Sequence, residues 1–208
     1  METKPDRKAP GGFSRRDFIK GVGTGALGTA VLPHLFAQDA ITTKRGRVAV
    51  YDKKTIALTV NGAPKTVLVA ANETLLDVLR DRFDLTGAKR TCNRGECGGC
   101  TVLLDGEPVY ACMTLAIRTD GKSVTTVEGL ARSGKLHPAQ ESFIEHDGYQ
   151  CGFCTPGFLM TTVAFLAKNP SPTRDEVRHA LSGNLCRCGN YAKIYKAVEA
   201  AAARMKGA

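Results

Sequence analysis

The stretch CNRGECGGC, Cys92–Cys100, places three cysteines on one short loop, and Cys112 follows after eleven further residues. Three thiolates at x4 and x2 spacing with a distant fourth are typical of plant-type [2Fe–2S] ferredoxins. Such a loop can surround a cluster and point its backbone N–H groups at the sulfurs, and its glycines supply the backbone freedom this needs. We therefore expect one [2Fe–2S] cluster on a first cysteine set: Cys92, Cys97, Cys100 and Cys112.

Four more cysteines follow in two pairs, Cys151-x2-Cys154 and Cys186-x-Cys188, separated by 31 residues. Each pair lies next to predicted helices, so two facing loops could present four thiolates to one cluster. A Cys-x2-Cys pair alone also occurs in zinc and redox-thiol sites, but the rarer Cys-x-Cys partner favours an iron–sulfur cluster. We expect a second [2Fe–2S] cluster on this second cysteine set: Cys151, Cys154, Cys186 and Cys188.

Other uses of eight cysteines fit the spacings less well. Four disulfides would need a Cys-x-Cys pair in a tight turn and three cysteines within nine residues, which is poor disulfide geometry. Zinc accepts four cysteines, but its motifs commonly combine two Cys-x2-Cys pairs. A Rieske centre needs two histidines, and neither set has one at ligand spacing. We expect the histidines after the leader on helix ends and surfaces: His137, His146 and His179.

Alternating apolar and polar residues around the first set predict a small sheet. Asn61-Gly62 and Asp105-Gly106 are typical of hairpin turns. Helical spacing of apolar residues predicts one helix over Glu73–Phe83, with Asn72 as its N-cap. A sheet crossed by one helix indicates a β-grasp domain over residues 55–129. The predicted strands are Thr55–Val60, Lys65–Ala70, Thr101–Leu104, Val109–Tyr110 and Val124–Val127.

From Leu130 onward the pattern becomes helical, and Thr173 with Glu176 forms the signature of a capping box. The fold class is therefore α+β, with a plant-type ferredoxin domain followed by an all-α four-helix domain over residues 130–208. Each half has about 75 residues, a size at which an apolar core alone is marginal and bound metal adds folding free energy. The predicted helices are His137–Asp147, Pro156–Lys168, Thr173–Ser182 and Ala192–Met205.

The N-terminus carries the sequence Ser14-Arg-Arg-Asp-Phe-Ile-Lys20 before a Gly- and Ala-rich segment that ends near Ala37. A twin arginine in this setting predicts a Tat export signal over residues 1–37, a linker over 38–54 and a periplasmic location. Gly21–Leu35 is too short for a stable membrane span. The Tat route carries folded proteins, so clusters could occupy the cysteines before they meet an oxidising compartment.

The formal net charge of +9 does not indicate nucleic-acid binding. Residues 1–37 hold six Lys/Arg against three Asp/Glu, so part of the charge lies in the leader. Thiolate-ligated clusters would add negative charge to the mature chain. The sequence has no Trp, and no basic run is interleaved with aromatic residues.

Four motifs together resemble the iron–sulfur subunit of the xanthine oxidase (molybdenum hydroxylase) family. They are the run Cys92–Val102, Glu128-Gly-Leu130, the run Gln150–Gly157 and Gly183-Asn-Leu-Cys-Arg-Cys188. The motifs span essentially the whole chain after the leader. With the leader included, the chain looks most like iron–sulfur subunits of exported bacterial aldehyde oxidoreductases. It departs from many members at Gly189-Asn190, where they have Thr-Gly.

The resemblance implies a non-catalytic subunit that relays electrons from a molybdopterin-type cofactor on a large partner subunit. The second cysteine set would hold the proximal cluster and the first set the distal one. Gln150 would contact the pterin, and Cys188 would lie nearest to it. The electrons would pass to FAD on another subunit or to a cytochrome, because this chain has no dinucleotide-binding or P-loop motif.

Three other functions remain open on the sequence alone. The chain could serve an N-heterocycle hydroxylase of the isoquinoline or xanthine type, because substrate-contacting residues would lie on the large subunit. It could be a carrier or redox sensor without a catalytic partner. It could be a secreted binding module with four disulfides, which would contain no iron.

Overall fold

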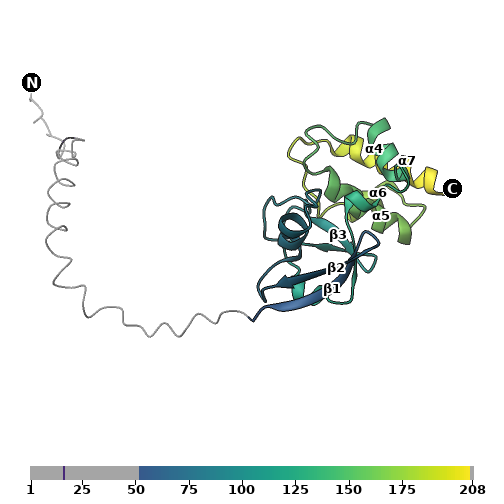
Figure 1. Ribbon diagram of the computed structural model, residues 1–208. Coiled ribbons are helices and arrows are strands. Elements are labelled where there is room, and N and C mark those ends of the chain that lie inside the picture. Colours follow the sequence, from purple (N-terminus) through teal and green to yellow (C-terminus); the bar gives the residue numbers. More distant parts are fainter. Residues whose placement is uncertain (1–15, 17–51, 207–208) are drawn as a thin grey trace, which may run out of the picture. The chain divides into compact units, whose positions relative to one another are not determined.

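A computed structural model describes Arg16 and residues 52–206 of the chain (Figure 1). Apart from Arg16, the predicted leader lies outside the described residues, as does most of the linker. Lys54, predicted as the last linker residue, is instead the first residue of β1 (Lys54–Val60). None of the helices in the described part has the length and apolar character needed to cross a bilayer.

Five strands form one mixed sheet in the order β2-β1-β5-β3-β4. The central strands β1 and β5 run parallel, and the other neighbours are antiparallel. Both hairpins turn at the predicted pairs, where Asn61, Gly62, Asp105 and Gly106 have positive φ. The bounds of the other strands are β2 (Ala63–Val69), β3 (Thr101–Leu104), β4 (Glu107–Tyr110) and β5 (Ser123–Thr125).

The helix that crosses the sheet begins later than predicted. Thr74, not Asn72, is the N-cap of α3 (Leu75–Asp77), because its hydroxyl accepts from the Asp77 N–H while the Asp77 carboxylate accepts from the Thr74 N–H. The chain then widens into a π-helical turn, η1 (Val78–Arg82). Apolar residues of both turns are fully buried against the sheet: Leu75, Leu76, Val78 and Leu79.

The last predicted strand also ends earlier, at Thr125. Asn61 holds the chain here, since its side chain accepts from the Thr126 N–H at 2.8 Å and donates to the Thr126 hydroxyl at 2.9 Å. The chain then turns into the 3-10 helix η3 (Val127–Gly129), so Val127 lies outside the strand. A further 3-10 helix, η2 (Ala116–Thr119), precedes β5.

Four helices follow, as predicted, and share a second apolar core. The structure confirms the capping box of Thr173 and Glu176 at the start of α6. Helix α5 packs against β3, so the helical half lies directly on the sheet (Figure 1). The helices are α4 (Pro138–Glu145), α5 (Thr155–Lys168), α6 (Arg174–Ala180) and α7 (Tyr191–Lys206).

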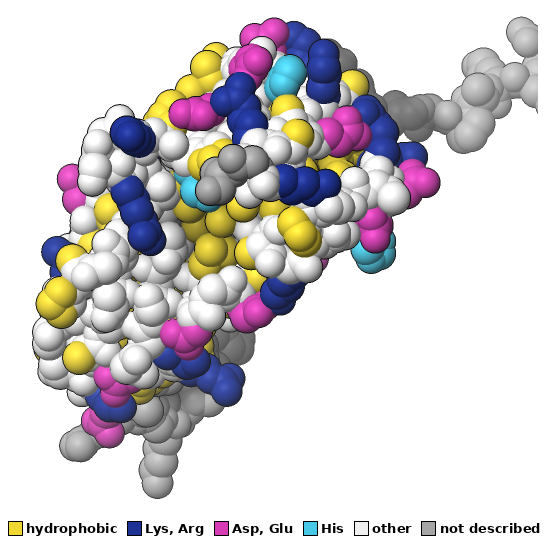
Figure 2. Space-filling model, turned by 90° about the vertical axis from the view of Figure 1, so that its right-hand side faces the viewer, with side chains coloured by type: hydrophobic (Ala, Val, Ile, Leu, Met, Phe, Trp, Pro, Cys, Tyr) yellow, Lys and Arg dark blue, Asp and Glu magenta, His cyan; other side chains and the backbone are white. Residues whose placement is uncertain are grey.

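The predicted α+β class is thus confirmed, with a mixed sheet followed by helices. Residues 52–206 belong to one compact unit that contains two apolar cores. The boundary between domains at residues 129 and 130 stays a prediction. On the face in Figure 2, Lys and Arg side chains are interspersed with Asp and Glu around a hollow of hydrophobic side chains.

The two halves meet where glycines allow backbone to approach backbone. A Cβ atom on Gly157, in the first turn of α5, would lie 2.2 Å from the carbonyl oxygen of Gly98. Real Cβ atoms do not come this close to a backbone oxygen, and backbone moves less easily than a flexible side chain. Gly157 therefore permits α5 to lie against the first cysteine loop.

We expect Gly157→Ala to lower the free energy of unfolding by about 1–3 kcal/mol, because the added methyl group forces the two halves apart. Thermal unfolding of the iron-loaded protein measures this as a lower midpoint. Ala167→Ser, at an exposed position of the same helix, is the control and should change little. An unchanged midpoint in Gly157→Ala would contradict the close contact.

Candidate metal centres

The first cysteine set gathers on a loop and at the ends of two strands. Cys100 lies immediately before β3 and Cys112 shortly after β4, so the hairpin brings the fourth cysteine back toward the loop. The loop turns through residues with positive φ, including Asn93, Gly95 and Gly98. These turns let the Glu96 N–H point at the Cys92 sulfur, 3.4 Å away.

The four thiols of this set are arranged as two pairs. Cys97 lies close enough to Cys92 to affect its pKa, and Cys112 affects the pKa of Cys100 in the same way. Burial raises the pKa of the Cys100 thiol to about 12. Burial also acts to raise the pKa of Cys92, but hydrogen bonds from the Arg94 and Glu96 backbone and from Cys97 outweigh it and lower the value to about 7.

The second cysteine set forms two further pairs from the loops before α5 and α7. Cys151 lies close enough to Cys188 for the two thiols to affect each other's pKa, and both are exposed. Cys154, the N-cap of α5, hydrogen-bonds with Cys186, which is buried. Burial raises the pKa of the Cys154 thiol to about 12. One pair therefore faces outward and the other faces the interior.

This arrangement of eight thiols fits two [2Fe–2S] clusters. All eight cysteines lie in the described part of the chain, and all are free. Among the described residues, no group of three or more His, Cys, Asp or Glu side chains is placed to hold one metal ion. A [2Fe–2S] cluster needs two ligands on each of two irons, so two pairs of thiols match its requirement.

Tyr191 supports the second loop from the start of α7. Its hydroxyl accepts a hydrogen bond from the Cys186 N–H at 2.9 Å. The ring packs edge-on against Phe158 of α5, with 6.3 Å between the ring centroids. The loop then turns at Gly189, which has a φ of +73° and donates its N–H to the Cys186 carbonyl. These contacts fix the backbone that carries the last two cysteines.

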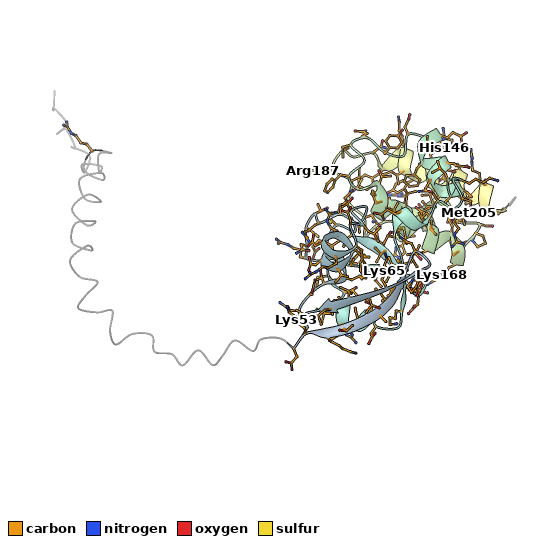
Figure 3. All side chains as sticks on the ribbon, in the orientation of Figure 1. Lys53, Lys65, His146, Lys168, Arg187 and Met205 are labelled. Atoms are coloured by element: carbon orange, nitrogen blue, oxygen red, sulfur yellow. The ribbon has the colours of Figure 1, made fainter. Side chains whose placement is uncertain are left out.

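Gln150 lies beside the outward-facing pair. Its side chain is exposed, and its amide N–H donates to the Asn190 side chain at 3.4 Å. Asn190 is buried and also donates to the Asp147 carbonyl at 2.8 Å. Arg187, between the last two cysteines, lies at the outer edge of the helical half, away from Met205 (Figure 3).

The other residues singled out in the sequence lie at helix ends, on the surface or in hydrogen bonds that stabilise the fold. His137 and His146 are the two caps of α4, and His179 is exposed on the last turn of α6, as expected. The Glu128 carboxylate accepts hydrogen bonds from the Thr126 hydroxyl and from the Gly87 N–H. These bonds stabilise the segment that connects the two halves.

The sequence did not single out three side chains that contact the cysteine loops: Tyr110, Asn184 and Tyr191. Each lies within five residues of a cysteine, and Asn184 also stands in the motif Gly183–Cys188, but neither signal assigned these side chains a role.

Comparisons with known proteins agree with this geometry. The family model for the 2Fe-2S iron–sulfur cluster binding domain matches residues 58–128, and the model for the [2Fe-2S] binding domain matches residues 126–199. The nicotine 6-hydroxylase small subunit of Paenarthrobacter nicotinovorans is 53% identical over 147 residues, which are 71% of this chain and 88% of the relative. The chain belongs to the xanthine oxidase family. It is a [2Fe–2S] subunit of a molybdenum hydroxylase.

Two further relatives place this iron–sulfur subunit within the family. The aldehyde oxidoreductase iron–sulfur-binding subunit of Escherichia coli (strain K12) is 39% identical over 93% of this chain and 90% of that protein. The crystal structure of quinoline 2-oxidoreductase from Pseudomonas putida 86 contains a chain that is 46% identical, with a TM-score of 0.72. That match covers 74% of this chain and 97% of the other.

Membership confirms the cofactors and the general role. The iron–sulfur subunit carries two [2Fe–2S] clusters, and the molybdopterin cofactor belongs to a large partner subunit. The subunit transfers electrons and does not itself perform the hydroxylation. These conclusions replace the carrier without a partner and the disulfide-linked module as descriptions of the chain.

We expect Tyr191→Phe to destabilise the iron-loaded protein by about 1–3 kcal/mol, because the buried Cys186 N–H loses its acceptor. The reduction potential of the second centre should shift as well, since backbone N–H groups around the sulfurs set it. Thermal unfolding and an EPR-monitored redox titration measure the two effects. Tyr195→Phe, one turn later on α7, is the control; equal behaviour of the two variants would contradict the role of Tyr191.

Proposed function

We propose that this chain is the electron-transfer subunit of an exported, molybdenum-dependent aldehyde oxidoreductase. The second cysteine set holds the proximal cluster and the first set the distal one. The observation that carries this order is the exposure of Cys151 and Cys188, while Cys154 and Cys186 face the interior. An outward-facing pair can approach a cofactor on the partner subunit, and an inward-facing pair can pass an electron into this chain.

The residues of this chain hold and orient the centres. When bound, each [2Fe–2S] centre takes up and gives up one electron at a time. The thiolates fix each centre in the fold, and backbone donors such as the Glu96 N–H stabilise negative charge on sulfur. Burial of Cys100 and Cys112 keeps water from part of the first centre. No side chain of this subunit needs to act as an acid, a base or a nucleophile.

Exposed apolar side chains support docking of the large subunit at the outward-facing pair. Phe153 is 50% exposed and Leu185 is 53% exposed, and both line the same small cavity as Cys151. Exposed apolar groups beside a functional site are typical of protein interfaces. In this arrangement, Gln150 and Cys188 contact the pterin across the interface.

The proposal of an aldehyde substrate rests on how much of this chain aligns with one relative. The E. coli aldehyde oxidoreductase subunit aligns with 93% of this chain, so the alignment includes most of the residues before β1. The matches to the nicotine 6-hydroxylase and nicotinate dehydrogenase small subunits cover 71% and 74% of the chain, although they cover 88% and 98% of those proteins. An aldehyde oxidoreductase subunit that aligns across most of the predicted leader supports an enzyme of the aldehyde type.

The second candidate is an N-heterocycle hydroxylase. The 53% identity to a nicotine 6-hydroxylase small subunit favours it, because that identity exceeds the 39% to the aldehyde oxidoreductase subunit. Turnover by the purified complex separates the candidates, with a dye as electron acceptor and either an aldehyde or a pyridine-type heterocycle as substrate. Turnover of the heterocycle alone would reject the aldehyde assignment.

The final acceptor is FAD on a further subunit or a cytochrome. The surface beside the first cysteine set could bind this acceptor. Met113, next to Cys112, is 63% exposed, and Leu115 is also exposed. Arg118 and Lys122 line a cavity of about 360 Å³ together with these two side chains. An acceptor with an acidic group would suit Arg118 on this surface, since Lys122 is already paired with Asp105.

We expect Cys188→Ser to remove the proximal centre and retain the distal one, because the two ligand sets lie on separate loops. EPR of the reduced protein should lose one of two [2Fe–2S] signals, and iron should fall from about four to about two per chain. Cys112→Ser is the matched variant and should remove the other signal. Loss of both signals from either variant would contradict the division of ligands.

We expect Lys in place of both Arg15 and Arg16 to keep the protein in the cytoplasm, because the Tat route reads the arginine pair. Cell fractionation and immunoblotting of wild-type and variant chains measure the location. Lys4→Arg, which keeps the charge and leaves the pair intact, is the control. Export of the double-lysine variant at the wild-type level would reject the Tat proposal.

A further inference from the structure

Arg80 is a half-buried cation in the π-helical turn η1, and it forms no ion pair with any described residue. The acidic residues of the same two turns, Asp77 and Asp81, pair with Arg90 instead. The Nε atom of Arg80 is buried and has no hydrogen-bond partner in the described part of the chain. Because water screens such a charge only weakly, it acts on neighbouring groups more strongly than a surface charge does.

The guanidinium group of Arg80 contacts the segment that precedes the first cysteine loop. Its Nη1 atom donates to the carbonyl oxygens of Thr86 and Ala88, at 2.8 Å in each case. Ala88 is only 3% exposed. A hydrogen bond from a charged donor is stronger than one between neutral groups. Arg80 therefore polarises the peptide group that joins Ala88 to Lys89.

This peptide group continues a chain of hydrogen bonds toward the cysteines. The Lys89 N–H donates to the Gly99 carbonyl at 2.9 Å, and that carbonyl shares a peptide group with the Cys100 N–H. In a trans peptide group the C=O and N–H bonds point in opposite directions, so both peptide groups direct their N–H away from Arg80. Hydrogen bonds in such a chain polarise one another. The charge of Arg80 thus increases the partial positive charge on the Cys100 N–H.

The Cys100 N–H ends this chain at a ligand of the first set. Cys100 is only 3% exposed, and its N–H donates to no other group among the described residues. A buried N–H is nearly always paired. A sulfur atom of a centre bound at this loop is an acceptor that would pair it. The free donor therefore fits the centre that the first cysteine set predicts.

We propose that Arg80 raises the reduction potential of the first centre by polarising the Cys100 N–H through these two peptide groups. Arg80 acts through other groups and is thus a positioning residue for electron transfer. The inference rests on the proposed function, because the first ligand set defines this centre. The centre gains one negative charge when it accepts an electron. A polarised donor stabilises this reduced form more than the oxidised form, so the potential rises.

The sign of the shift separates this role from support of the fold alone. If Arg80 only held residues 86–88 in place, its removal would admit water to the first centre. Water stabilises the more negative, reduced form, so the potential of the centre would rise. Loss of a polarising cation has the opposite effect and lowers the potential.

The test is an EPR-monitored redox titration of the assembled complex that carries Arg80→Met. The signal that Cys112→Ser removes identifies the first centre. We expect the potential of this centre to become more negative in Arg80→Met, while that of the second centre stays at the wild-type value. The potential should fall less in Arg80→Lys, which keeps the charge but lacks the planar group that reaches two carbonyls.

Arg82→Met is the matched control. Arg82 lies on the same turn, but its side chain is 56% exposed and pairs with Glu73. The same substitution at this position removes a charge that water and a carboxylate already screen. It should leave both potentials unchanged.

Each outcome decides a separate claim. An unchanged or higher potential of the first centre in Arg80→Met, with both centres present, would overturn the inference, as would an equal shift in both centres. If Arg80→Met assembles without the first centre, Arg80→Lys decides: a lower potential supports the inference, and a potential at or above the wild-type value overturns it. A wild-type complex without two [2Fe–2S] signals would instead reject the proposed function.

Discussion

The hydrogen bond from the Leu185 N–H to the Cys97 carbonyl joins the two cysteine loops, and the arrangement of the two halves depends on it. Two separate apolar cores, one under the sheet and one among the helices, could be joined in many ways. Direct backbone contact between the two halves selects one arrangement and requires glycine at Gly98 and Gly157. The same contact that assembles the fold therefore brings the two ligand sets together.

Metal binding and folding are coupled in such a small protein. Each half offers a limited apolar core, and each cysteine set includes buried thiols, such as Cys100 and Cys186. Because the complete set of cysteine ligands comes together only in the folded chain, the free energy of metal binding adds to the free energy of folding that the apolar cores supply. The hydrogen bonds of Asn184 and Tyr191 stabilise the cysteine loops in another way, because they pair polar groups that are buried beside these loops.

The features that could be predicted from the sequence are those set by the spacing of residues and by the alternation of apolar and polar residues along the chain. The cysteine intervals, the Asn61-Gly62 and Asp105-Gly106 turns, and the capping box at Thr173 each depend on residues close together in the chain. Pairing within each set, contacts across the junction and the outward direction of Cys151 depend on tertiary packing. The N-cap of α3 differs from the prediction for a local reason: Asn72 is a favourable N-cap residue type, but only Thr74 has an acidic residue three positions later, Asp77, to complete a capping box.

The central claim is that this chain holds two [2Fe–2S] clusters on eight cysteines. The most direct measurement is the iron and acid-labile sulfide content of the protein purified without oxygen. We predict about four irons and about four sulfides per chain, as two such clusters require. A protein with no iron and all eight cysteines oxidised would contradict the account.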